Sequence, residues 1–417
     1  MKPLSALVLI DVAKSLHIIH PHAKELAVDE SFSIITPLVI DFILGQVVFG
    51  PLITTCWRGA WIGFNLLLDN HLFPNHPDLN TAGCVILGVS GINLMTYVPA
   101  LFHYFCEDFK SGWVFFALSR TFTILAFGSG MILWKGWWDV CSMSGASWNQ
   151  GLAFLGVGMV IMMCLGNSRS NIGFPLAIRV DSRDKYFHLN GFTLLDPKTT
   201  EFSNQWVFLF TVINLILTTF SEVLVISCWF GVWTIEDSLS ASWVGSGSLG
   251  EAFASCCIGV SVATLTFSVQ FWFLQVLGPT SNENDIRSAV LHFCANQVLA
   301  SLGLVATVSN LRGIWYLLDL ILPEDTFSWT LLGSFVLAFS SLELLGIATT
   351  LHGGIIQDPK PGDPFLIHGF YTTYFYMNKL KFQCNSKNPE LYLDLNGRAP
   401  LASSDTETPM TEIPIKP

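Results

Sequence analysis

The sequence predicts an all-α membrane protein with eight transmembrane helices, built from four two-helix repeats arranged as two pseudo-symmetric halves. Three observations lead to this fold class. Hydrophobic residues make up 51% of the chain and charged residues only 12%, whereas a soluble domain carries about 25% charged residues. The mean hydropathy is +0.53. Long apolar runs follow one another, and a short aromatic motif recurs along them.

The apolar runs are long enough to cross a hydrocarbon core of about 30 Å, which takes roughly 17–25 helical residues. Runs such as residues 207–226 are continuous rather than alternating, so they predict helices and not the strands of a barrel. The predicted spans are 34–57, 82–105, 113–135, 151–167, 206–229, 252–277, 290–311 and 328–351.

These spans divide the chain into two halves of four helices. Halves in this order are typical of parallel-repeat transporters, in which an axis along the membrane normal relates them. The predicted organisation is a cytoplasmic N-terminal segment at 1–31, a first transmembrane half at 32–167, a cytoplasmic loop at 168–205, a second half at 206–351, and a cytoplasmic tail at 352–417, largely disordered after 383.

The recurring motif is a Gly, any residue and a Trp, placed where an outward-going span meets its connecting loop. Each copy is followed by a return span, and the spacing predicts a repeating unit of about eighty residues. A cation precedes the Gly in three copies, and Phe230 replaces it in the third copy along the chain. The motif residues are Trp57, Gly59 and Trp61, then Gly136 and Trp138, then Gly231 and Trp233, then Gly313 and Trp315, and the cations are Arg58, Lys135 and Arg312.

Two interpretations of the motif stay open. Trp prefers the headgroup level of a bilayer and long cationic side chains reach toward it, which favours an interfacial anchor. Anchoring alone does not require Gly at one fixed offset, which favours a specific site. An acidic or amide residue also follows the last Trp of each copy, at four residues for Asn65, Asp237 and Asp319 and directly for Asp139.

The distribution of Lys and Arg predicts the orientation. Most of the 20 cationic residues fall in the N-terminal segment, the even-numbered loops and the tail. Because loops rich in Lys and Arg stay in the cytoplasm, both termini are expected there, with the chain in the plasma membrane.

Ionisable residues inside the predicted spans are costly and indicate either function or a structural ion pair. Those of interest are Asp41, Arg120, Glu222 and Glu343, with the motif cations Arg58, Lys135 and Arg312. We expect Arg120 to pair with Asp41 or Glu343, and Glu222 to pair with a motif cation. Such pairs either lock helices together or belong to a polar track through the bundle.

No pattern in the sequence predicts a catalytic, cofactor-binding or metal site. The chain has no nucleophile elbow, phosphate loop or dinucleotide fingerprint, so an enzyme is not expected. His17, His20 and His22 lack a Cys or carboxylate at helical spacing, which argues against a metal site. The absence of a basic stripe argues against nucleic-acid binding.

The repeated motif on an eight-span chain resembles the Fuseless family of invertebrate multi-pass membrane proteins. The resemblance rests on Cys56-Trp57-Arg58-Gly59-Ala60-Trp61 and on the run from Asn310 to Asp319, and covers roughly residues 32–355. It implies a protein of the presynaptic plasma membrane, linked to calcium-channel placement and synaptic transmission. The family provides no assigned catalytic or ligand-binding residues.

Two hypotheses about function follow. The first is a non-enzymatic membrane protein that organises or regulates another membrane complex such as a presynaptic calcium channel, using the tail and the 168–205 loop as docking surfaces. The alternative is a transporter or ion channel with a polar pathway through a pseudo-symmetric helix bundle. In both, the bilayer is the first partner.

Overall fold

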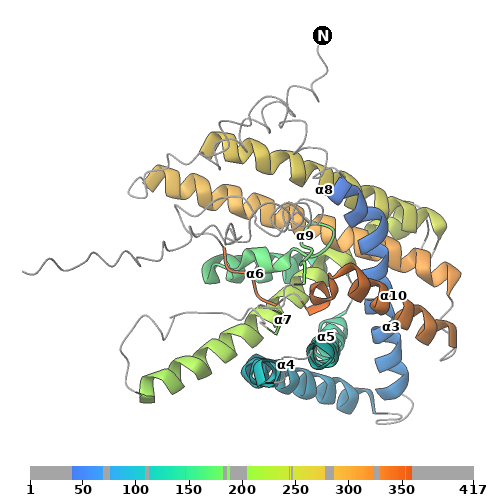
Figure 1. Cartoon of the computed structure of the whole chain (residues 1–417). Helices are drawn as coiled ribbons and strands as arrows, with labels where there is room; N and C mark the ends of the chain where they lie inside the picture. Colours follow the sequence, from blue (N-terminus) through green and yellow to red (C-terminus); the bar gives the residue numbers. More distant parts are fainter. Residues whose placement is uncertain are drawn as a thin grey trace, which may run out of the picture.

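A computed structural model describes residues 40–68, 76–108, 112–145, 147–181, 186–187, 204–243, 245, 248–277, 286–322, 329–352 and 354–358 (Figure 1). These residues form helices joined by short irregular segments, and they contain no β-strand. The predicted N-terminal segment at 1–31, with its three His residues, and the tail after 383 lie outside the described residues.

The all-α class of the prediction is confirmed over this part of the chain. Seven helices are long and apolar enough to cross a membrane, and the helix Trp329–Leu345 is apolar but shorter, so the eight-span count stays a prediction. The elements are a π-helical turn η2 (Gly45–Phe49) leading into α3 (Gly50–Leu67), then α4 (Pro77–Asp108), α5 (Gly112–Met143), α6 (Trp148–Leu165), η4 (Ser168–Asn171), α7 (Asn204–Trp243), α8 (Leu249–Leu277), α9 (Ile286–Ile321), α10 (Trp329–Leu345) and η6 (Ala348–His352).

The four helices that carry the motif, α3, α5, α7 and α9, contact one another in the interior, and α4, α6, α8 and α10 pack around them. The most extensive contacts join α4 to α5, α6 to α7, α8 to α9 and α10 to α3 (Figure 1). The motif helices α5, α7 and α9 therefore pack against the helix that precedes each of them, and not against the return span that follows in the sequence repeat. The last helix, α10, closes the arrangement onto α3.

The motif Gly residues help to explain this pairing, because each lies at a close approach of a motif helix to its outer neighbour. A Cβ atom at Gly231 would lie 2.6 Å from the carbonyl oxygen of Gly151, too close for any side chain. Small residues at such positions let helix backbones approach in a membrane. The four contacts are Gly59 on Phe335 of α10, Gly136 on Val85 of α4, Gly231 on Gly151 of α6 and Gly313 on Cys256 of α8.

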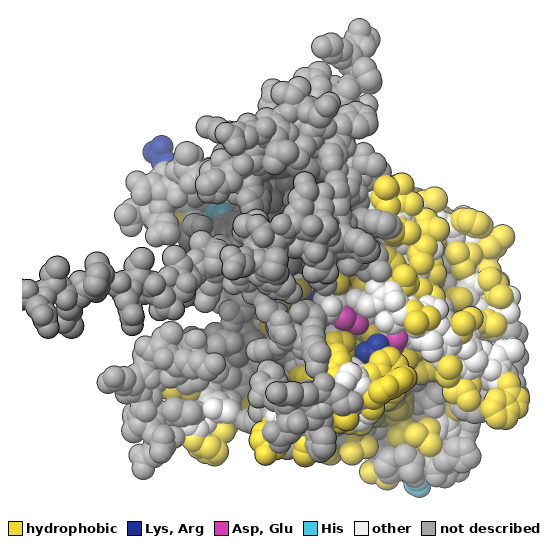
Figure 2. Space-filling view, in the orientation of Figure 1, with side chains coloured by type: hydrophobic (Ala, Val, Ile, Leu, Met, Phe, Trp, Pro, Cys, Tyr) yellow, Lys and Arg dark blue, Asp and Glu magenta, His cyan; other side chains and the backbone are white. Residues whose placement is uncertain are grey.

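The outer helices present large apolar side chains outward, and hydrophobic side chains predominate on the coloured part of the surface at the right of Figure 2. Soluble proteins rarely expose apolar patches of this extent, so the outer surface suits contact with lipid. Exposed residues of this kind include Ile86 and Leu94 on α4, Val157 and Val160 on α6, Ile258 and Leu265 on α8, and Val336 and Leu337 on α10.

Two of the outer helices end in the same way and lead into buried irregular segments. α6 stops at Gly166 (φ 68°) and α10 stops at Gly346 (φ 66°), both in the left-handed conformation that favours Gly at a helix end. The segments η4 and η6 follow directly. The first part of the predicted cytoplasmic loop at 168–205 is thus not a free docking surface, because Ser168, Asn171 and Leu176 are wholly buried in the bundle.

Candidate functional site

The last Trp residues of the four motif copies form a closed ring in the centre of the bundle. Each indole meets its two neighbours edge to face, at interplanar angles of 84° to 90°. This geometry places the positive edge of one ring against the negative face of the next. The ring-centre distances are 6.0 Å for Trp61–Trp138, 5.6 Å for Trp138–Trp233, 6.1 Å for Trp233–Trp315 and 6.2 Å for Trp61–Trp315.

A second aromatic layer lies one helical turn away, at the first position of the motif. Trp134 contacts Trp57 and Trp229 edge to face at 5.0 and 4.9 Å, and Trp57 stacks on Trp229 at 6.1 Å. Leu311 occupies the fourth equivalent position and lines the same cavity as the three Trp residues. The motif Trp residues therefore face each other, which favours the specific-site interpretation over a lipid-facing anchor.

The motif cations are buried and each meets a carboxylate near the helix ends. Arg58 is 2% exposed and its Nε lies 2.5 Å from Asp319 Oδ1. Lys135 Nζ lies 2.8 Å from Asp139. Arg312 is fully buried and pairs with Asp237 at 2.7 Å and with Glu251.

Two of these pairs follow one rule: the cation of one copy meets the Asp four residues after the last Trp of the preceding copy in the cycle. Arg312 reaches Asp237 in this way, and Arg58 closes the cycle onto Asp319. The rule also accounts for Phe230. The preceding motif copy has Ser142, and not an Asp, four residues after its last Trp. A cation at position 230 would therefore lack this partner, and Phe230 packs instead on Trp138, with ring centres 5.1 Å apart.

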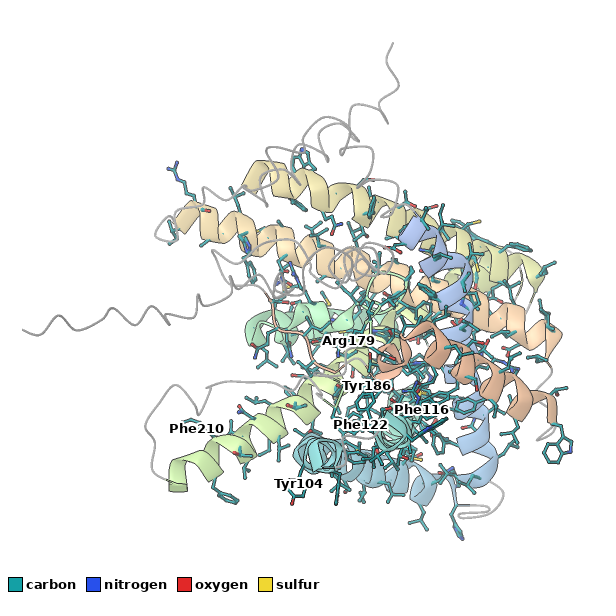
Figure 3. The ribbon with its side chains drawn as sticks, in the orientation of Figure 1. Tyr104, Phe116, Phe122, Arg179, Tyr186 and Phe210 are labelled. Carbon is teal, nitrogen blue, oxygen red and sulfur yellow. The ribbon has the colours of Figure 1, made fainter. Side chains whose placement is uncertain are left out.

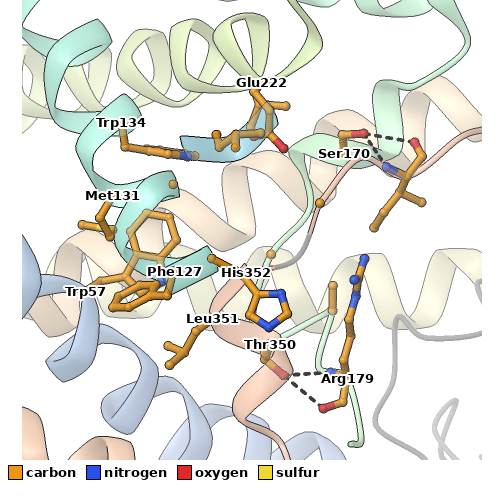
Figure 4. Close-up of a pocket in the computed structure, with 18 of the residues that line it drawn as sticks. Trp57, Phe127, Met131, Trp134, Ser170, Arg179, Glu222, Thr350, Leu351 and His352 are labelled. Carbon is orange, nitrogen blue, oxygen red and sulfur yellow. Dashed lines mark hydrogen bonds between the residues drawn. The ribbon is translucent and has the colours of Figure 1, made fainter. Parts of the chain in front are cut away.

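A cavity of about 160 Å³ lies beyond the second Trp layer. Figure 4 shows Trp57, Phe127, Met131 and Trp134 at one end, Ser170 and Arg179 at the other, and Glu222 and His352 between them. The space corresponds to about five water molecules at ~30 Å³ each. The cavity thus has an aromatic end and a polar end.

Glu222 is the carboxylate of this cavity, and its electrostatic partner is Arg179. The expectation that Glu222 pairs with a motif cation is wrong, because the three cations turn to the acidic residues described above. Depth estimated along a helix gives no information on the direction in which a side chain points. Burial lowers the pKa of the Arg179 guanidinium to about 10, and the charge of Glu222 opposes that shift.

His352 lies beside Arg179 at the end of η6. Neither ring nitrogen has a hydrogen-bond partner, and the ring meets Phe122 edge to face at 5.7 Å. Burial lowers the pKa of His352 to about 4, and the charge of Arg179 acts in the same direction. The imidazole is therefore neutral at pH 7. The sequence analysis did not select Arg179 or His352 as site residues. The pattern that could have indicated them is a short apolar helix that ends at a Gly in each half, because both residues follow such a helix.

Two loops form the polar end of the cavity by exchanging hydrogen bonds. Asp181, beyond η4, accepts two backbone N–H bonds at the start of η6, and Asp358, beyond η6, accepts two at the start of η4. Each segment thus receives a carboxylate at its N-terminal end, where anions are favoured. The donors are Ala348 N (3.2 Å) and Thr349 N (3.0 Å) to Asp181, and Ser168 N (3.2 Å) and Arg169 N (2.9 Å) to Asp358.

The exchange continues along both loops. The Ser170 hydroxyl accepts from Ile356 N at 2.8 Å and donates to Ile356 O at 3.0 Å. The Thr350 hydroxyl accepts from Arg179 N at 2.9 Å and donates to Arg179 O at 3.2 Å. The backbone of Arg179 is therefore fixed independently of its side chain.

Arg120 lies near the same loops and forms an ion pair with Glu343, with 2.6 Å between the guanidinium nitrogen and the carboxylate oxygen. Glu343 is one of the two partners predicted from the sequence. Its guanidinium lies 4.3 Å from the ring centre of Phe116. Tyr186 lies near Phe116 and Phe122 (Figure 3) and shares a 2.8 Å hydrogen bond with Thr123, a residue of α5 like Arg120. Asp41, the other candidate partner, is wholly buried in the helical stretch that leads into α3.

Several amide side chains of the helices have separate local roles. Asn93 of α4 donates to Thr219 of α7 at 3.3 Å. Asn296 accepts from Arg169 at 2.5 Å, and Gln297 donates to Asp358 at 3.4 Å, so both hold the η4 region. Among the described residues, no group of three or more His, Cys, Asp or Glu side chains is placed to hold a metal ion.

Comparison with known proteins gives one family. No curated protein matches the sequence, and no solved structure matches the fold. The sequence model of the Fuseless family matches residues 36–351, a segment that contains all four motif copies, both broken outer helices and the cavity residues Arg179 and Glu222. Because this match covers most of the chain, the protein belongs to the Fuseless family.

Proposed function

We propose that this protein is a non-enzymatic, multi-pass membrane carrier that binds a small solute in the central cavity. The observation that carries the proposal is the pair of half-buried, oppositely charged side chains, Glu222 and Arg179, that line one cavity inside the bundle. Ionisable groups are expensive within a membrane protein and concentrate on substrate pathways.

The two broken outer helices support a carrier. Many transporters place their binding site where short, interrupted helices occupy corresponding positions in two halves. Irregular backbone at membrane depth is tolerated where it is enclosed in protein or lines a cavity. The segments after α6 and α10 meet this description, since Ser170 and Thr350 both line the cavity.

We also propose the full topology of eight spans in two pseudo-symmetric halves. α6 has 18 residues and α10 has 17, and at 1.5 Å per residue the shorter helix still rises about 26 Å. The hydrogen bonds of Asp181 and Asp358 support the relation between halves, because their donors at 168 and 169 and at 348 and 349 stand at a constant offset. The Lys and Arg distribution supports cytoplasmic termini at the plasma membrane.

The test is solute binding followed by flux. Purified full-length protein is screened by thermal shift against a library of small polar metabolites, and each hit is measured by counterflow in proteoliposomes. At least one compound should raise the unfolding midpoint and be taken up, and Glu222→Gln should abolish both effects. Asp78→Asn, at an exposed carboxylate of α4, serves as the matched control. A library without hits, together with vesicles no more permeable than empty ones, would refute the carrier.

Family membership supports a second proposal, in which the protein organises or regulates presynaptic calcium channels and so influences synaptic transmission. Its docking surface would be the tail, which lies outside the described residues. A calcium channel should then co-purify with the full chain in mild detergent, and removal of 384–417 should release it while solute binding persists. Retention of the channel by the truncated chain would exclude the tail as the docking surface.

A further inference from the structure

We infer that the central cavity is a site for a small zwitterion, a solute with an ammonium group and a carboxylate a few bonds apart on an apolar body. This inference rests on the proposed carrier function and specifies its substrate class. The argument uses the charges, the unpartnered polar atoms and the apolar end of the cavity.

The two charges of the cavity attract each other but do not touch. Over the described part of the chain, no hydrogen bond or ion pair within 4.0 Å joins Glu222 to Arg179, although each acts electrostatically on the other. Buried charges without direct partners are costly, and a pair held apart across a cavity leaves room for a ligand between them. The ammonium of a zwitterion would meet Glu222 and its carboxylate would meet Arg179.

Among the described residues, no side-chain hydrogen bond or ion pair engages the guanidinium of Arg179, and Thr350 holds the backbone of this residue through two hydrogen bonds. A planar guanidinium is the side chain best matched to a carboxylate, which it binds through two parallel hydrogen bonds. His352 lies next to it with both ring nitrogens unpartnered, so a neutral imidazole can donate to or accept from the same ligand.

The charge balance selects a zwitterion over a simple ion. When Glu222 is ionised and His352 is neutral, the charges of Glu222 and Arg179 sum to zero, so a net-neutral ligand that carries both charges pairs with both residues. A ligand that carries only a positive charge leaves Arg179 without a counter-charge. A ligand that carries only a negative charge leaves Glu222 without one. Either case carries the penalty of an unpaired buried charge.

The aromatic end of the cavity determines that the uncharged part of the ligand is apolar. Trp57, Phe127 and Trp134 offer apolar and aromatic surface at the end remote from Arg179 (Figure 4). Aromatic faces suit an aliphatic group and also attract an ammonium that lies close to them. The volume of the cavity, about 160 Å³, restricts the ligand to the size of a single amino acid.

The experiment measures binding of three matched probes to the purified full chain in nanodiscs by calorimetry. Leucine carries both charges, isopentylamine lacks the carboxylate and isocaproate lacks the ammonium. We expect leucine to bind at least tenfold more tightly than either analogue. Glu222→Gln should lose the preference for leucine over isocaproate, Arg179→Gln should lose the preference over isopentylamine, and Asp78→Asn should keep both.

The outcomes separate this inference from the carrier itself. Equal or tighter binding of a single-charge analogue overturns the zwitterion and leaves the carrier standing. Failure of all three probes, and of a wider set of amino acids, also overturns the zwitterion, while the metabolite screen decides independently whether any solute binds. The comparison of probes on wild-type protein does not depend on the variants, so a variant that fails to fold cannot obscure the result.

Discussion

Asp181 and Asp358 form reciprocal hydrogen bonds between the two halves of the molecule. Asp181, which follows η4, accepts backbone N–H bonds from the start of η6, and Asp358, which follows η6, accepts them from the start of η4. Their own backbone N–H groups donate to Gly346 and Gly166, each at 2.7 Å. The segments that line the polar end of the cavity are thus fixed only when both halves are in place. Several measurable consequences follow from this arrangement and from the motif.

Removal of one of these carboxylates should loosen the polar end of the cavity. Asp181→Ala leaves the N–H groups of Ala348 and Thr349 without acceptors, which costs about 1–3 kcal/mol for each buried group left unpaired. We expect a lower midpoint in a thermal unfolding scan, and a similar drop for Asp358→Ala. The exposed Asp78→Asn should leave the midpoint unchanged. An unaltered midpoint in both variants would contradict the reciprocal role.

The motif Gly residues should not tolerate a methyl group. Gly231→Ala places a Cβ 2.6 Å from the Gly151 oxygen, so α6 and α7 must separate, at a cost of about 1–3 kcal/mol or more. Gly156→Ala, on α6 itself, meets nothing within 4 Å and provides the matched control. Thermal unfolding should separate the two variants, and equal midpoints would argue against close helix approach at the motif.

The pair of Arg58 and Asp319 should contribute to stability through direct coupling. Loss of one partner from a buried pair costs about 3–5 kcal/mol, and the 30% exposure of the Asp319 side chain places the expected value at or below the lower end of that range. Arg58→Met and Asp319→Asn, measured singly and together, form a double-mutant cycle. We expect the double variant to be less destabilised than the sum of the single variants. Strict additivity would mean that the two charges do not interact.

The Trp ring should depend on each of its members. Trp233 meets Trp138, Trp315 and Tyr316 edge to face, and such contacts contribute about 0.5–1.5 kcal/mol each beyond their buried area. Trp233→Leu should therefore lower the unfolding midpoint, whereas Trp243→Leu should not, because Trp243 is 85% exposed. If Trp243→Leu proved the more damaging change, the ring could not be a main element of the core.

Acid should destabilise the protein through His352. Its folded pKa of about 4 lies below the ordinary value of 6.5, so the unfolded chain binds the proton more readily. Stability is then fully present above pH 6.5 and is lost as pH falls toward 4, by about 2 kcal/mol at pH 5 for this group alone. Unfolding midpoints from pH 7 to 4.5 should fall more steeply for wild type than for His352→Gln. Parallel curves would show that His352 is not the group that titrates.

Much of this architecture was predictable from local sequence. The length of the apolar runs and the low charge predict membrane helices, because the cost of transferring side chains into lipid is a sum over neighbouring residues. Recurrence of one motif pointed to four helices with a shared role, and in the structure each motif Gly lies against a neighbouring outer helix. Arg120 and Glu343 could be proposed as partners because both are charged and lie at a similar depth.

Only the tertiary structure decided how the helices pair and where the polar side chains point. Hydropathy gives the depth of a residue but not the rotation of its helix about the axis, so Glu222 was assigned to motif cations that in fact face Asp139, Asp237 and Asp319. The contact of α3 with α10 joins the two ends of the described bundle, and no local pattern encodes it. Composition fixes that this chain enters a membrane. Packing between distant segments fixes the cavity, because its walls come from five different α-helices and from the two irregular segments after α6 and α10, which meet only when the bundle closes.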